Sequence, residues 1–153
     1  MREGSLPPPH SKIMKGAGDA ARFLAPLLAD QAQECLAVLL LDNRHRPLGV
    51  VEVARGNVNM VHVQPRDVFT PALVSGAQAV IVAHNHPSGD PTPSPDDRHL
   101  TESLVDAGTL LGVQMLDHLV IGHGRACTAS PGSQGSTPFR LGERAVQWTG
   151  LDR

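Results

Sequence analysis

The sequence predicts an α/β domain in which helices cover a central β-sheet. Residues 36–41 and 80–83 are short runs that are apolar on both faces, which is typical of strands buried inside a sheet. Residues 64–75 and 95–111 repeat apolar side chains at helical spacing and are each followed by a glycine, a common helix stop. We therefore expect buried strands with amphipathic helices packed against them.

The other elements follow from shorter patterns. Asp19 can cap a short helix whose apolar positions, Phe23, Leu24, Leu27 and Leu28, recur at helical spacing. The remaining predicted strands are residues 47–54, which return from 36–41 as a hairpin, and residues 58–63 and 113–121. His62 and His118 fall inside these strands, where we expect packed or hydrogen-bonded histidines rather than metal ligands.

The domain boundaries follow from composition. Residues 1–18 hold three consecutive prolines and no periodicity, so we expect a disordered leader. Residues 19–125 should form one domain. Residues 126–153 shift to serine, glycine, threonine and proline, and we expect a low-complexity or loosely packed tail.

Composition narrows the class of partner. A net charge of −2 and 3% aromatic residues give no basic field for phosphates and few platforms for bases, so nucleic acid is not an evident partner. The longest apolar run, residues 35–41, is far too short to span a membrane, and the N-terminus lacks the apolar centre of a signal peptide. Cys35 should pack as a reduced thiol, which indicates a cytoplasmic protein. The sequence does not indicate an oligomeric state.

Two histidines stand where the strand of residues 79–83 ends. Residues two apart in an extended chain point the same way, so His84 and His86 can offer imidazoles to one point while Asn85 faces away. Neutral imidazole is the commonest protein ligand for transition metals. A loop rich in proline and glycine then returns the chain to Asp97, the candidate third ligand.

Asp97 also has a simpler interpretation. Ser94 fits the N-cap of the helix that follows, and an acid three residues later completes a capping box. However, Asp97 lies three residues before Leu100 on the apolar stripe of that helix, and an acid that only meets solvent should not face inward. We therefore favour a ligand role.

Two histidines and one aspartate leave the fourth position of a tetrahedral zinc ion open for water, which is the pattern of a catalytic site. Such a site needs a general base. The candidates are Glu34, Glu52, Asp90 and Asp96, and spacing does not choose among them, although Glu34 stands at the start of a buried strand. Ser94 could donate a hydrogen bond to the oxyanion.

The pattern His84-x-His86, seven residues, Ser94, two residues, Asp97 resembles the JAMM motif of the MPN/JAB zinc metallopeptidases. Beyond this motif, the sequence resembles the RadC branch of these proteins over roughly residues 19–125. The matching segments include Gln33-Glu34 and residues 65–68, 83–91 and 116–118. The resemblance implies a mixed sheet flanked by helices, akin to cytidine deaminase. It also implies one zinc ion per chain held by His84, His86 and Asp97, with Glu34 as general base and Ser94 steadying the tetrahedral intermediate.

The resemblance implies hydrolysis of peptide or isopeptide bonds, and the family name implies DNA repair. Deaminase chemistry lacks support, because the sequence has neither His-x-Glu nor Cys-x-x-Cys. RadC proteins commonly carry a helix-hairpin-helix region that residues 1–18 cannot encode. The alternatives are a binding module without hydrolytic activity and, less favoured because of the low basic charge, a metal-dependent nuclease.

Overall fold

The structure, a computed structural model, describes residues 2–3, 13–29, 31–56, 62–90, 92–122, 126–131 and 144–147. For residues 2–3, 126–131 and 144–147 it describes the backbone alone. The elements in chain order are β1 (Arg2–Glu3), α1 (Ala17–Leu28), β2 (Glu34–Leu41), β3 (Pro47–Gly56), α2 (Pro65–Ser75), β4 (Ala79–Asn85), α3 (Pro95–Leu111), β5 (Gln114–Ile121), β6 (Ala126–Pro131) and β7 (Arg144–Gln147).

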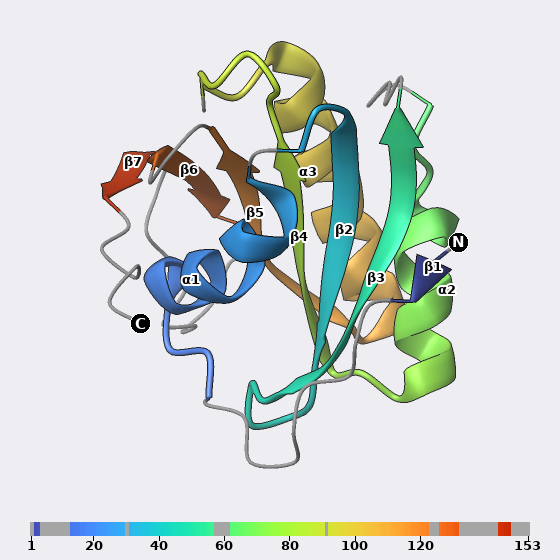
Figure 1. Cartoon of the computed structure of the whole chain (residues 1–153). Coiled ribbons are helices and arrows are strands. Elements are labelled where there is room, and N and C mark those ends of the chain that lie inside the picture. Colours follow the sequence, from blue (N-terminus) through green and yellow to red (C-terminus); the bar gives the residue numbers. More distant parts are fainter. Residues whose placement is uncertain are drawn as a thin grey trace.

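Within the described residues, the strands form one mixed sheet in the order β1-β3-β2-β4-β5-β6-β7. β4 and β5 run parallel, and the other neighbouring strands run antiparallel. α1 covers one face of the sheet, and α2 and α3 cover the other (Figure 1). The predicted α/β class, a mixed sheet flanked by helices, is confirmed.

The two faces of the central strands explain why their sequences are apolar throughout. In β2 and β4, odd-numbered residues such as Leu39 and Ile81 pack beneath α1. Even-numbered residues such as Val38 and Val82 pack against α2 and α3. Each strand therefore contributes to both core layers, as expected of strands that are covered on both sides.

The predicted hairpin and the helices of residues 64–75 and 95–111 are present, and Gly76 and Gly112 end those helices in the left-handed conformation. α1 begins at Ala17, and its N-cap is Gly16 rather than the predicted Asp19. Asp19 still acts at this end, because its carboxylate accepts the Lys15 backbone N–H at 3.0 Å from inside the first turn. Cys35 is a buried, free thiol, as predicted.

Three predictions concern segments that are only partly described. In the predicted strand 58–63, residues 58–61 lie outside the described residues, whereas His62 is exposed in a turn and is not packed as expected. In the predicted leader, Arg2–Glu3 pair with β3, and residues 1 and 4–12 lie outside the described residues. None of the helices described is long and apolar enough to cross a bilayer.

The segment expected to form a low-complexity or loosely packed tail contains two strands, β6 and β7. β6 pairs with β5 from Ile121↔Cys127 to Asp117↔Pro131, and β7 pairs with β6, so both extend the sheet. Their small and polar residues show no apolar alternation, and strand formation there depends on the neighbouring edge of β5, which local sequence does not reveal. The rest of residues 126–153 lies outside the described residues.

Asp117 on β5 is fully buried, and within the described residues neither of its carboxylate oxygens has a hydrogen-bond partner. Burial raises its pKa to about 8, although the nearby His118 backbone amide opposes the shift. An acid with a higher pKa in the folded state than in the unfolded chain holds more protons when folded, so stability falls as pH rises through that interval.

We therefore expect the free energy of unfolding to fall between about pH 4 and pH 8, by up to about 1.4 kcal/mol per pH unit from this group. Urea unfolding of wild type and Asp117→Asn across that range measures the effect, and the variant should show a flatter profile. Asp106→Asn, on the exposed side of α3, is the control and should retain the wild-type slope. Equal slopes for wild type and Asp117→Asn would contradict the expectation.

Candidate metal centre

Strand geometry places three predicted site residues on one face of the sheet. Glu34 begins β2, His84 lies near the end of β4, and His86 directly follows that strand; all three are at even-numbered positions, on the side that faces α2 and α3. β2 and β4 are antiparallel with Leu36 opposite His84, so the start of β2 lies beside the end of β4. This register brings residues 50 positions apart to one point.

Asp97 approaches from the first turn of α3. Its Oδ2 accepts the Ser94 backbone N–H at 2.7 Å, and its own backbone N–H donates to Ser94 Oγ at 3.1 Å. These two bonds are the predicted capping box. The side chain is nevertheless buried, and its Oδ1 lies 3.2 Å from His84 Nε2, so capping and an inward position coexist.

Four potential ligand atoms converge. His84 Nε2 and His86 Nε2 are 3.0 Å apart, and Asp97 Oδ2 is 3.4 Å from His86 Nε2. Ligand atoms bound tetrahedrally to one zinc ion lie roughly 3.4 Å apart, which is close to these separations. Glu34 also offers an oxygen within 4.8 Å of both imidazoles, but at 3.9 Å from His84 it lies farther out than Asp97. Glu34, His84 and His86 thus form a group that could hold a metal ion, and Asp97 lies closer to His84 than Glu34 does.

The hydrogen bonds around His84 assign its tautomer. The Thr101 hydroxyl donates to the Asp97 carbonyl at 2.9 Å, so it accepts from His118 Nδ1, 2.7 Å away. Since burial lowers the pKa of His118 to about 3, its ring is neutral and Nε2 is a bare acceptor. That atom lies 2.9 Å from His84 Nδ1, which must therefore carry the proton. His84 Nε2 consequently faces the site with a free lone pair.

The tautomer of the neutral His86 ring follows from a single hydrogen bond. Its Nδ1 donates to the Asp90 carbonyl at 2.9 Å, because a carbonyl can only accept, and this leaves Nε2 without a proton in the neutral ring. The lone pairs of both imidazoles and the Asp97 carboxylate are thus directed at one another. A positive charge, either a proton on His86 or a bound metal ion, relieves the repulsion among these groups.

Burial and the closeness of the imidazoles and carboxylates shift the pKa values of Asp97, His86 and Glu34. Burial favours the neutral form of Asp97, but the imidazoles of His84 and His86 hold its pKa well below the ordinary value. The Asp97 carboxylate raises the pKa of His86 against the effect of burial. Burial raises the pKa of Glu34, and the two imidazoles oppose that rise.

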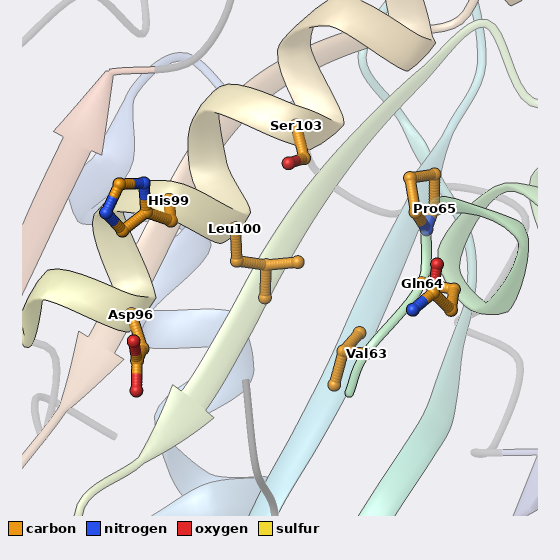
Figure 2. Close-up of a pocket in the computed structure, with 7 residues that line it drawn as sticks. All are labelled: Val63, Gln64, Pro65, Asp96, His99, Leu100 and Ser103. Atoms are coloured by element: carbon orange, nitrogen blue, oxygen red, sulfur yellow. The ribbon is translucent and has the colours of Figure 1, made fainter. Parts of the chain in front are cut away.

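The other candidate bases are directed elsewhere. Glu52 forms an ion pair with Arg55 at 2.6 Å. The Asp90 carboxylate accepts from the Thr92 amide and hydroxyl, and only its backbone carbonyl contacts His86. Asp96 lines a separate cavity of about 340 Å³. Figure 2 shows this cavity, with Asp96, His99, Leu100 and Ser103 of α3 on one side and residues 63–65 on the other. Glu34 alone among the four candidates has its carboxylate beside the histidines.

Two polar residues of the site were missed by sequence reasoning. Thr101 lies one helical turn after Asp97 on the inward face of α3, and this spacing could have indicated it. Asn85 faces away from the cluster, as predicted, but bonds the backbone beside Glu34. His118 is structural, as predicted, and its role is to orient His84.

The fold and this cluster define an α/β domain of the JAB type with a candidate metal site. Residues 14–134, more than half of the chain, match the family model described as RadC-like JAB domain. The chain belongs to the RadC family. The match extends beyond residue 125, in agreement with the position of β6 in the sheet.

The curated relatives carry only a family label. The chain is 48% identical over 102 residues to a UPF0758 protein of Symbiobacterium thermophilum, an overlap that covers 67% of this chain and 44% of the relative. It is 44% identical over 117 residues to a UPF0758 protein of Acaryochloris marina, covering 76% and 48%. The chain thus spans less than half the length of these relatives.

Proposed function

We propose that this protein is a zinc-dependent metallohydrolase of the JAMM type that cleaves peptide or isopeptide bonds. The observation that carries the proposal is the convergence of two imidazole nitrogens and one carboxylate, with a second carboxylate, Glu34, at 3.9 Å from His84. Three protein ligands leave a position open, which is the arrangement of catalytic rather than structural zinc sites. A bound zinc ion would lower the pKa of a water molecule to about 7 and polarise the substrate carbonyl.

Each side chain then has a defined task. His84, His86 and Asp97 would hold the metal. Glu34 would accept the proton of the attacking water and deliver it to the leaving amine, and its raised pKa suits a group that both takes and gives a proton. Ser94 Oγ accepts from the Asp97 backbone N–H, so its own proton remains able to donate to the oxyanion of the tetrahedral intermediate.

The proposal includes a peptide or isopeptide substrate and a cytoplasmic location. An amide substrate follows from the proposed roles of these residues. An activated water, a group that accepts its proton and a hydrogen-bond donor to the oxyanion together suit attack on the carbonyl carbon of an amide. The reduced, buried Cys35 supports a reducing compartment. A role in DNA repair rests on the family name, and the net charge of −2 lends it no support.

Metal analysis tests the proposal. Protein purified without added zinc should contain about one zinc ion per chain. A chelator should abolish hydrolysis of quenched fluorescent peptides, linear and isopeptide-linked, and added zinc should restore it. His86→Ala should lose the metal, whereas His99→Ala, which removes an exposed histidine of α3 outside the cluster, should retain it. Equal zinc contents in these two variants would contradict the proposed site.

A further inference from the structure

Asn85 occupies the position between the two candidate ligands, yet its side chain lies apart from them. It ends β4 at an odd-numbered position, so it points to the face opposite His84 and His86. The residue is 3% exposed and buried among backbone groups. A buried carboxamide must find partners for both its oxygen and its nitrogen, and those partners define its role.

All of the partners flank Glu34. The Cys35 backbone N–H donates to Asn85 Oδ1 at 2.7 Å, and Asn85 Nδ2 donates to the Gln33 carbonyl at 3.0 Å. Nδ2 also lies 3.4 Å from the Gln31 carbonyl, a longer bond. One side chain of β4 therefore binds the peptide groups immediately before and immediately after Glu34.

This attachment matters because the regular pairing of β2 with β4 stops short of Glu34. The last paired residues are Leu36 and His84, so Glu34 lies two positions beyond the end of that ladder. On its other edge Glu34 pairs with Gly56, the last residue of β3. The distance between the carboxylate and the imidazoles thus depends on how the start of β2 is fixed to the end of β4, and the Asn85 amide makes that connection.

We infer that Asn85 is a positioning residue that fixes Glu34 at its working distance from the metal ligands. The inference rests on the proposed function for its catalytic consequence, but the attachment itself can be measured separately. The task requires a group that accepts from one amide and donates to carbonyls at the same time. Asparagine meets that requirement, whereas aspartate of the same size turns an oxygen toward the carbonyls of Gln33 and Gln31.

Two variants test the inference. Asn85→Asp retains the size of the side chain, and Asn85→Ala removes all of its polar contacts. Both should lower kcat about 100-fold with KM little changed, because a displacement of about 1 Å in a catalytic group has an effect of that order. Both should retain about one zinc ion per chain, because the ligand side chains are unaltered.

Amide hydrogen exchange reports the attachment without reference to activity. The Cys35 amide should exchange at least about tenfold faster in Asn85→Ala, which removes its acceptor, whereas the Leu39 amide, in the middle of β2, should keep its wild-type rate. Gln33→Ala is the matched control, since it removes an exposed side chain and leaves the backbone carbonyl that Asn85 binds. This control should match wild type in zinc content, kcat and exchange.

The outcomes separate the inference from the proposed function. Wild-type kcat in both variants, or an unchanged Cys35 exchange rate in Asn85→Ala, would overturn the positioning role. Loss of zinc together with activity would also overturn it, because Asn85 would then act on the ligands rather than on Glu34. If wild-type protein binds zinc but hydrolyses none of the peptides, the proposed function fails, and faster Cys35 exchange would still establish the attachment of the Glu34 segment.

Discussion

Replacing Glu34 by glutamine should reduce peptide hydrolysis about 1,000-fold, within the range expected when a general acid–base group is removed. Glutamine has nearly the same size and can still lie beside His84, but it cannot accept a proton from water. The zinc content should stay at the wild-type level, because Glu34 at 3.9 Å from His84 Nε2 lies outside the set that we assign as ligands. Single-turnover kinetics and metal analysis of the same preparation measure both effects.

The matched control is Glu52→Gln, because Glu52 is also a partly buried acid of the same sheet but pairs with Arg55. It should retain activity within a small factor. If Glu34→Gln kept full turnover, another group would have to be the base. If the biological activity survived while turnover disappeared, the binding-module alternative would be favoured.

Replacing Asp97 by asparagine should weaken zinc binding at least about 100-fold while the fold persists, since even partners beyond the ligands can contribute factors of 10 to 100. Asparagine keeps an oxygen that can accept the Ser94 N–H, so the start of α3 should survive. The variant loses the negative charge that lies between the two imidazoles. Competition with a zinc-sensitive dye measures the affinity, and circular dichroism measures the helix.

α2 supplies a matched control for Asp97→Asn. Asp67 occupies the same position in its own capping box, and its Oδ2 accepts the Gln64 N–H at 2.8 Å. Asp67→Asn makes the same chemical change at a helix start outside the described metal cluster. Because the amide oxygen can still accept the Gln64 N–H, this change should cost little stability, and it should leave zinc affinity unchanged. Equal zinc affinities for the two variants would mean that Asp97 serves only as a cap.

Local patterns were sufficient to predict the elements that deliver the site. β2 and β4 could be predicted from their own apolar runs. The bounds of α3 could be predicted from its capping residues, Ser94 and Gly112. The choice of Glu34 over Glu52, Asp90 and Asp96 could not be made from spacing. It depends on the register that sets Leu36 opposite His84, which is a contact between distant segments.

What escaped prediction depended on partners elsewhere in the chain. β6 and β7 have no strand pattern of their own; β6 pairs with the edge of β5, and β7 pairs with β6. The roles of Thr101 and Asn85 arise only when α3 and the start of β2 reach the end of β4. Polar residues of these kinds occur in many loops and helices, so their identity alone carries little information about function.

The hydrogen bonds from Thr101 through His118 to His84 also affect which imidazole of the cluster can take up a proton in competition with a metal ion. His84 is held with Nδ1 against His118 and with Nε2 facing the cluster. His86 differs, because the neighbouring carboxylate strengthens its hold on a second proton. If the cluster holds a metal ion as proposed, mild acid should expel that ion by charging His86, the less buried imidazole, while His84 keeps its orientation.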